Sequence, residues 1–398
     1  MPGHQVPARP ILTEPWREVN SMDAFMEDCS EQIALGIKTA LEKCFESELL
    51  EQLQTSWGKH NPDRVDYRNG YRYRSLQTRL GLIKDLKVPR SREGTYQSKI
   101  LPRYKRYEAG VEELVRSSFL AGISTRRVGE VLEPLMGGSV SASTVSEITK
   151  ALDDQVRKYH QRKLADDVVY LFADAVYMTT KGGAKATRKA VLTVYVVKSS
   201  GEKELLDFRV ADSESEAQWE SFLNHLYNRG LEGSKLRLII SDGGTGLHAA
   251  LQMVYGHVKR QRCWVHKMRN LFGRLRAKQR EGCFAQLRTV YQAKNITEAR
   301  ENYRRWAEAW SQEAPEAVAC VEKDLEELLN FFAEPAALAR RLRTTNAIER
   351  CFREVRRRTN PMSCFNNRES CERIIYAIFA HQNNRWKDRP IPEFTHNT

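Results

Sequence analysis

Two stretches of the sequence decide the fold: residues 168–174, VVYLFAD, and residues 236–242, LRLIISD. Each is a short run of mainly apolar side chains that ends in an aspartate, Asp174 in the first and Asp242 in the second. Runs of this length and composition are typical of strands buried in a sheet. The sequence therefore predicts two buried strands, each with a carboxylate at its end.

The segments around these stretches predict an α/β fold. Strand patterns occupy residues 168–173, 189–197, 205–210, 236–240 and 258–264, whereas helix patterns occupy residues 214–229, 243–255 and most of 266–343. The short links between the first three strands predict an antiparallel meander, and the helix that follows permits a right-handed crossover. A fourth strand parallel to the first would give a ribonuclease H-like sheet, with Asp174 beside Asp242.

Asp174, Asp242 and Glu349 are the candidate catalytic residues and metal ligands. Neighbouring carboxylates repel unless a cation lies between them, and Mg²⁺ is a hard ion that accepts carboxylate and phosphate oxygens. Glu349 lies in TTNAIER, residues 344–350, where a helix begins, and Arg353 and Arg356 follow on the same helical face. Three acids of this kind predict two Mg²⁺ or Mn²⁺ ions, which would activate a water or 3′ hydroxyl and stabilise the leaving oxygen.

The charge of the chain predicts a polyanionic partner. The 398 residues carry a formal net charge of +13, and residues 59–107 alone contain 14 Lys or Arg against 4 Asp or Glu, with six tyrosines interleaved. A solvated basic face is the simpler interpretation, but this clustering favours phosphate contacts. Arg68, Arg72 and Arg90 are the candidate DNA contacts in this segment.

Residues 111–152 have the punctuation of a helix-turn-helix. One helix is expected at about 111–120, a second from Ser124 to Leu135, and a third after Ser141 or Ser143. Many helical bundles show the same punctuation. If the motif is present, the residues on or beside the recognition helix are Ser143, Thr144 and Lys150, and those near backbone phosphate are Arg126 and Arg127.

Cys263 and His266 form a Cys-x-x-His pair. A structural zinc site needs four ligands, and no second pair follows at finger spacing, so a packed cysteine and histidine is the simpler interpretation. Residues 253–280 contain nine Lys or Arg and no acid, which predicts a DNA-facing surface with Lys267 and Arg269 as contacts. The glycines at 243, 244 and 246 lack a Walker Lys-Ser/Thr and are more typical of a tight turn.

The cysteines and the hydropathy predict a cytoplasmic, nucleoid-associated protein. None of the eight cysteines forms a Cys-x-x-Cys pair, which favours reduced thiols over a disulfide framework. The first residues lack a signal-peptide pattern, and no stretch approaches the roughly 18 apolar residues of a membrane span.

The sequence resembles the prokaryotic Mutator-type insertion-sequence transposases from about residue 68 to 386. The matching stretches are RNGYR (68–72), VPR (88–90), GISTR (122–126), VSASTVS (140–146), DAVY (174–177), SDG (241–243), GL (246–247), QRCWVH (261–266), RN (269–270) and TTNAIER (344–350), together with Glu214 and Trp219. Basic residues usually follow the first Asp of this family closely. Here three uncharged residues precede Lys181, so the resemblance assigns Lys181 no role.

The resemblance implies a DDE transposase whose ribonuclease H-like core is interrupted by a helical insertion before Glu349. It also implies recognition of terminal inverted repeats, action as a homodimer, and a circular intermediate. It places Cys263, Trp264 and His266 near the active site as supporting residues.

We accordingly expect six segments along the chain. They are a flexible lead-in (1–20), a helical and basic DNA-binding region (21–110), a helix-turn-helix domain (111–165), the first part of the core (166–265), a helical insertion (266–343) and the last part of the core (344–398). Two other classes fit part of the pattern. A non-catalytic DNA-binding regulator would not need the acids, and a nuclease such as a Holliday-junction resolvase would not join strands. The long basic N-terminal region favours the transposase over the nuclease.

Overall fold

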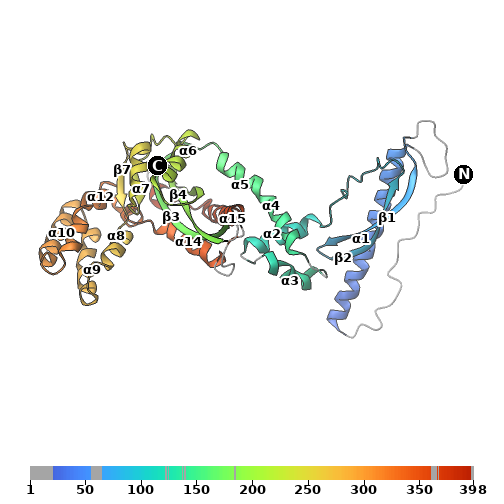
Figure 1. Ribbon diagram of the computed structural model, residues 1–398, viewed down its shortest axis with the longest axis horizontal. Helices are drawn as coiled ribbons and strands as arrows, with labels where there is room; N and C mark the ends of the chain where they lie inside the picture. The colour runs from blue at the N-terminus through green and yellow to red at the C-terminus, as the bar shows by residue number, and fades with distance from the viewer. Residues whose placement is uncertain are drawn as a thin grey trace. The chain divides into compact units, whose positions relative to one another are not determined.

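The computed structural model describes residues 21–54, 65–121, 123, 125–136, 138, 140–182, 185–359, 365 and 367–395. The chain forms two compact units, one of Met1–Phe119 with Thr125–Ile148 and one of Leu120–Ser124 with Thr149–Thr398. The expected lead-in at 1–20 lies outside the described residues. Figure 1 shows the elements of each unit.

The first unit begins with a long helix packed on a hairpin. Helix α1 (Met22–Leu53) follows the N-cap Ser21, and strands β1 (Arg68–Thr78) and β2 (Gly81–Ser91) pair antiparallel. Phe45 and Leu49 of α1 pack against Leu86 of β2. Strand β2 coincides with a weak alternation of apolar and polar residues at 82–92. Strand β1 was not expected, because arginines and tyrosines alternate there without an apolar face.

Three short helices complete the first unit, close to their expected positions. They are α2 (Ala109–Leu120), α3 (Thr125–Met136) and α4 (Ala142–Lys150). The Ser141 hydroxyl accepts a hydrogen bond from the Thr144 N–H at 3.2 Å, which caps α4. A Cβ at Gly129 would overlap the carbonyl oxygen of Val140, so glycine permits the close approach of this segment to α3. The unit boundary after Ile148 falls inside the segment expected at 111–165.

The second unit is built on a five-stranded mixed sheet, which confirms the α/β class. The strands are β3 (Val168–Gly182), β4 (Lys185–Lys198), β5 (Lys203–Ala211), β6 (Leu238–Ser241) and β7 (Lys259–Arg262), in the order β5-β4-β3-β6-β7. The first three strands form the expected antiparallel meander, and β6 lies parallel to β3. Strands β3 and β4 are longer than expected because their paired ends carry polar side chains instead of an apolar run.

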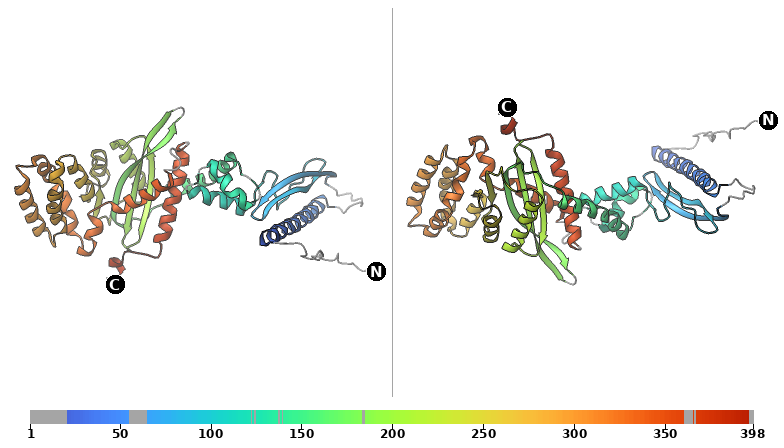
Figure 2. Two further views of the ribbon diagram at one scale, coloured as in Figure 1. Left: turned by 90° about the horizontal axis from the view of Figure 1, so that it is seen from below. Right: turned by 90° about the horizontal axis from the view of Figure 1, so that it is seen from above.

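Helices cover both faces of this sheet (Figure 2). Helices α6 (Glu216–Asn228) and α7 (Thr245–Tyr255) pack on one face, where Trp219 and Leu251 join the core beside Leu171. Helices α14 (Asn346–Thr359) and α15 (Arg368–Trp386) lie against the other face. The ring of Phe379 in α15 is 5.3 Å from that of Phe208 in β5. Helix α5 (Leu152–Gln161) packs on β5 and α15.

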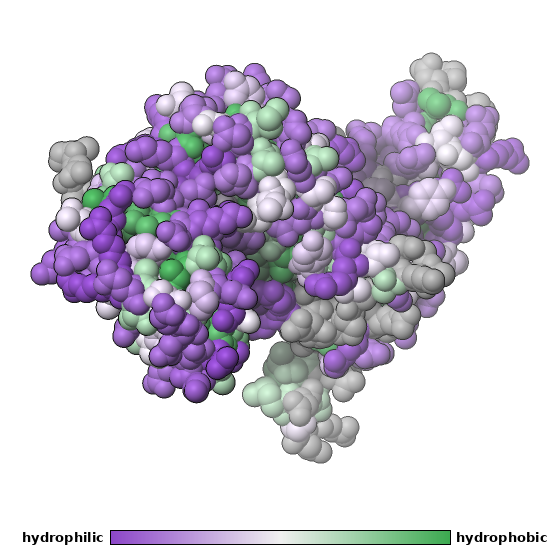
Figure 3. Space-filling view, turned by 60° about the vertical axis from the view of Figure 1, so that its left-hand side comes forward, coloured by the Kyte–Doolittle hydropathy of each residue, from purple (hydrophilic) through white to green (hydrophobic). Residues whose placement is uncertain are grey.

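The stretch expected to be helical before Glu349 is helical. It contains α8 (Trp264–Phe272), α9 (Ala277–Gln292), α10 (Ile296–Trp310), α11 (Pro315–Glu322), α12 (Leu325–Leu329), η1 (Asn330–Ala333), η2 (Ala336–Leu338) and α13 (Ala339–Leu342), and the short α16 (Pro392–Thr395) comes near the end of the chain. Hydrophilic residues dominate the face shown in Figure 3, and hydrophobic residues appear there in small patches. Among the described residues, no helix is both long and apolar enough to span a membrane.

Candidate active site

The sheet places Asp174 and Asp242 side by side. Ala173 of β3 pairs with Ser241 of β6 in the parallel ladder, so the aspartate that follows each one stands at the same level. Asp174 is 5% exposed, and its carboxylate accepts the N–H of Ala175 at 2.8 Å. The carboxylate of Asp242 accepts the N–H of Gly244 at 2.9 Å. The adjacency expected from the two apolar runs is therefore confirmed.

The expectation that Asp174 ends its strand is wrong. Strand β3 continues to Gly182, paired with β4, whereas β6 stops at Ser241. The apolar run ends at Asp174 because only the part of β3 before it is flanked by strands on both sides. Beyond β6, Gly243 has a φ of +86° and a Cβ there would overlap Arg262, as expected for a tight turn.

Asp174 is a buried acid among acids. Burial raises the pKa of its carboxyl to about 7, and the charges of Asp242 and Glu349 act in the same direction against the opposing charge of His266. Burial disfavours the charged form of His266 too, and so acts to lower its pKa. The hydrogen bond with Cys263 and the nearby aspartates outweigh burial and raise the pKa of His266 to about 9. The site therefore concentrates negative charge, and the His266 imidazolium is the cation that acts on Asp174.

Glu214 joins this group of acids, although the sequence analysis cited it only as part of the family resemblance. A Cβ at Gly244 would lie 3.5 Å from an Asp242 carboxylate oxygen and 3.8 Å from one of Glu214, so the two acids flank the same glycine. Burial and the charge of Asp242 both raise the pKa of Glu214. No local pattern predicts this, because the loop before α6 reaches Asp242 only through the crossover.

Glu349 lies in the first turn of α14, and its carboxylate is already paired with cations. Arg269 donates to both of its oxygens, at 2.8 and 3.2 Å, and the His266 Nε2 lies 3.6 Å away. Among the described residues, no three His, Cys, Asp or Glu side chains converge closely enough to hold a metal ion as they stand. Arg269, an expected DNA contact, instead holds the third acid in this structure.

Cys263, His266 and Thr345 connect α8 to the start of α14. The buried Cys263 Sγ accepts the Thr345 N–H at 3.3 Å, and the Thr345 hydroxyl lies 3.4 Å from the His266 Nδ1. Burial alone would raise the pKa of Cys263, but its hydrogen bonds, first that with His266, hold the pKa below its ordinary value. This arrangement positions Glu349 by fixing the turn just before it.

Trp264, expected to support the active site, and Lys267, expected to contact DNA, are both buried. Trp264 is 1% exposed, and its indole N–H donates to the Leu328 carbonyl at 2.8 Å, so it packs α8 against the helical segment. Lys267 is 3% exposed and forms an ion pair with Asp324. The expectation that Lys267 contacts DNA is corrected, because its ammonium group is enclosed and already neutralised.

The other expected DNA contacts are spread over both units. Those with exposed side chains are Arg90, Arg127, Ser143 and Lys150. Arg353 and Arg356, which were expected to support the active site beside Glu349, are also exposed. Lys181 is also exposed. Arg68 and Arg72 are half-buried, and Arg68 pairs with Glu46. Thr144 is half-buried beside the Ser141 hydroxyl, and the side chain of Arg126 lies outside the described residues.

The sequence is similar to those of known proteins over most of its length. A family model described as "Transposase, Mutator family" matches residues 16–389. The transposase of insertion sequence element ISRM5 from Rhizobium meliloti is 33% identical over 88% of this chain and 88% of its own length. The transposase of IS406 from Burkholderia multivorans is 36% identical over 81% and 83%, and that of IS256 in Tn4001 from Staphylococcus aureus is 30% identical over 90% and 91%.

These matches agree with an α/β unit that brings two aspartates together at the level where one strand ends. The chain belongs to the Mutator family of transposases. The relatives it matches are transposases of insertion sequences, so the expected family is confirmed.

Proposed function

We propose that this transposase cleaves and joins DNA by a DDE mechanism, with Asp174, Asp242 and Glu349 as the catalytic residues. The observation that carries the proposal is the parallel pairing of Ala173 with Ser241, which makes neighbours of two acids 68 positions apart in the sequence. One of them is buried without a lysine or arginine partner among the described residues. Burying such a group costs free energy, so acids of this kind are found mainly at functional sites.

The strand order supports a ribonuclease H-like core. The sheet has an antiparallel meander followed by a fourth strand that lies parallel to the first and next to it. This is the strand order that the sequence pattern predicts for such a core. The helical segment 266–343 then acts as an insertion between β7 and α14. In the first unit, α2, α3 and α4 supply the helices of the proposed helix-turn-helix, with α4 as its recognition helix.

The donor set of the acids suits Mg²⁺ or Mn²⁺. All the candidate ligands are carboxylate oxygens, which hard divalent ions prefer. The raised pKa of Asp174 means that the surrounding residues do not fully neutralise its charged form, which a bound cation would stabilise. Asp174, Asp242 and Glu349 would hold two ions, once Glu349 separates from Arg269. When bound, the ions would supply the activation of the attacking hydroxyl and stabilisation of the leaving oxygen.

The positively charged surfaces would bind the proposed partner, DNA. The exposed arginines of the first unit and of α14 would neutralise phosphates of the terminal inverted repeats and of target DNA. Holding two ends beside a target suits a homodimer on DNA and a circular intermediate, as in the family that the sequence resembles. Action on DNA would place the protein in the cytoplasm, at the nucleoid.

A strand-transfer assay tests this function. The purified protein, a labelled DNA end from its own element and Mg²⁺ or Mn²⁺ should give a nicked strand and then a joined product longer than the input, resolved on a denaturing gel. Asp174→Asn should abolish both products. Asp212→Asn is the matched control, because this exposed aspartate follows β5 and pairs only with Lys189. Shortened products without any longer species would support a nuclease instead, and wild-type cleavage in EDTA would exclude the metal mechanism.

A further inference from the structure

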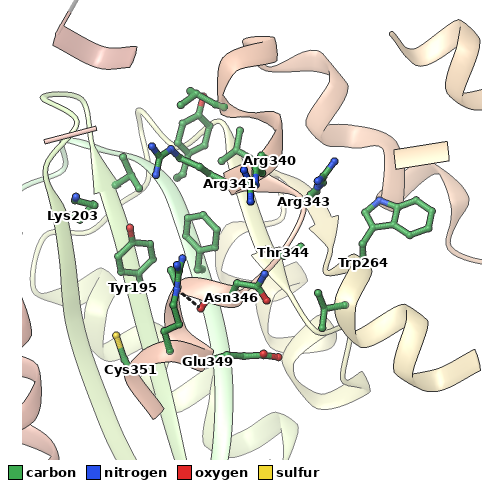
Figure 4. Close-up of a pocket in the computed structure, with 18 of the residues that line it drawn as sticks. Tyr195, Lys203, Trp264, Arg340, Arg341, Arg343, Thr344, Asn346, Glu349 and Cys351 are labelled. Atoms are coloured by element: carbon green, nitrogen blue, oxygen red, sulfur yellow. Dashed lines mark hydrogen bonds between the residues drawn. The ribbon is translucent and has the colours of Figure 1, made fainter. Parts of the chain in front are cut away.

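The second unit contains a large cavity next to Glu349. Its volume is about 1560 Å³, and it lies between the strands β3 and β4 and the helices α8, α9, α13, α14 and α15. Figure 4 shows Glu349 at one side of the cavity, Tyr195 and Lys203 on the strand side, and Arg340, Arg341 and Arg343 along the opposite rim. Small-molecule sites measure roughly 300–1,000 Å³, so this cavity has room for a larger ligand.

The cavity wall leads toward the acidic site along β3. Tyr170 and Phe172 line the cavity, and alternate residues of a strand point to the same face, so Asp174 follows them on that face. Glu349 itself belongs to the cavity wall. A strand with its scissile phosphate at these acids would therefore have this cavity as its continuation.

The rim of the cavity has a strong excess of positive charge. Nine Lys or Arg line it, against the three acids Glu349, Glu354 and Glu393. Arg288, Arg340, Arg353, Arg385 and Lys203 form no ion pair with any residue that the structure describes. Burial lowers the pKa of Lys203, and the nearby Arg341 and Arg389 lower it further, so the cations repel one another. A bound polyanion would relieve this repulsion.

The walls also offer flat aromatic surfaces. Trp386 is half-buried, with its ring 5.5 Å from that of Tyr195. Tyr291 is half-buried under the guanidinium of Arg343, at 4.9 Å, and Phe272 is exposed. Aromatic rings among arginines bind unpaired bases by stacking and phosphates by charge. Paired bases are stacked within their own duplex and do not present their faces.

We propose that this cavity binds several unpaired nucleotides at the end of a DNA strand, directly beside Glu349. The proposal rests on the DNA-cleaving function proposed above, and it adds a site for single-stranded DNA. The arginines of the rim hold the phosphates, and Trp386 stacks on a base. The cavity would thus favour DNA ends that are frayed or already nicked.

The test uses full-length protein with Asp174→Asn, which keeps the DNA intact. Its affinity is measured for a blunt 30-base-pair duplex and for the same duplex with a five-nucleotide oligothymidine extension. The extension should tighten binding about tenfold, because an unpaired base that stacks on an aromatic ring adds affinity. It should also steepen the salt dependence, and photocrosslinking from 5-iodouracil in the extension should map to Trp386.

The cavity variants separate this site from general DNA affinity. Arg340→Ala with Arg341→Ala, and separately Trp386→Ala, should remove most of the gain from the extension and leave binding of the blunt duplex unchanged. Arg304→Ala with Arg305→Ala removes the same charge from the exposed side of α10 and should keep the gain. Thermal unfolding verifies that each variant is folded.

Equal affinity for the two DNAs, or a gain that survives in the folded cavity variants, would overturn the proposal. Failure of the strand-transfer assay with an intact gain from the extension would instead overturn the proposed function and leave a site for single-stranded DNA. The two failures are therefore distinguishable.

Discussion

Two buried aspartates of the same sheet have opposite surroundings. Asp207 on β5 is fully buried, but His160 lies 2.6 Å from one of its oxygens and the buried Arg229 pairs with the other. These partners hold the pKa of Asp207 below its ordinary value in spite of burial. Asp174 on β3 is almost as buried, yet its neighbours include Asp242 and Glu349 and its pKa is raised to about 7.

We interpret the difference as that between an acid that stabilises the fold and an acid that the proposed mechanism uses. The charge of Asp207 is neutralised by permanent partners, so its burial contributes to the structure. The charge of Asp174 is offset only in part, by His266, so a proton or a bound cation would complete its neutralisation.

Replacing Asp174 should abolish catalysis without harming the fold. Asp174→Asn removes a metal ligand, so cleavage should fall by at least about a thousandfold, the scale seen when catalytic groups are removed. The unliganded protein should be as stable as the wild type or more so, because a poorly compensated buried charge is lost. Cleavage of a labelled DNA end and urea unfolding measure the two effects. A large loss of stability would mean that Asp174 is structural.

Replacing Asp207 should have the reverse effect. Asp207→Asn leaves Arg229 buried without its anion, which typically costs about 3–5 kcal/mol in the free energy of unfolding. The fraction that remains folded should cleave DNA at nearly the wild-type rate. Urea unfolding and the cleavage rate per folded molecule provide the comparison, and a catalytic defect in fully folded Asp207→Asn would contradict the distinction.

The stabilisation by Asp207 should disappear in acid. Its pKa in the folded protein is lowered relative to the ordinary value of about 3.9. The stabilisation is therefore fully present above about pH 4 and is lost as the pH falls through the lower, folded value. The stability gap between wild type and Asp207→Asn, measured by urea unfolding at several pH values, should narrow in that range. A gap that stays constant down to low pH would refute the assignment.

The sequence predicted the site only where local pattern controls it. Two apolar runs sufficed to bring Asp174 and Asp242 together, and the helix start with its arginines singled out Glu349. Glu214 and the burial of Lys267 depend on contacts between distant segments, namely the crossover into α6 and the ion pair with Asp324. Strand β1 escaped prediction because its side chains are exposed or half-buried up to Ser75, so no apolar pattern marks it.

Glu349 is intermediate between Asp207 and Asp174, because it is ion-paired but its partner is exposed. We expect the smallest effect for replacement of that partner. The partner, Arg269, is 57% exposed, and exposed ion pairs contribute only about 0–1 kcal/mol. Arg269→Gln should therefore tighten Mn²⁺ binding by no more than about fivefold, as measured by isothermal titration, while the fold keeps its stability. Weaker Mn²⁺ binding in this variant would show that Arg269 does not compete with the metal for Glu349.

The central claim is that the uncompensated acids around Asp174 form a metal site. Electron paramagnetic resonance tests it most directly, because the signal of free Mn²⁺ decreases when the ion binds protein. Wild type and folded Asp207→Asn should both remove Mn²⁺ from solution in a saturable way, and Asp174→Asn should remove far less at the same concentration. Equal Mn²⁺ binding by wild type and Asp174→Asn would contradict the account.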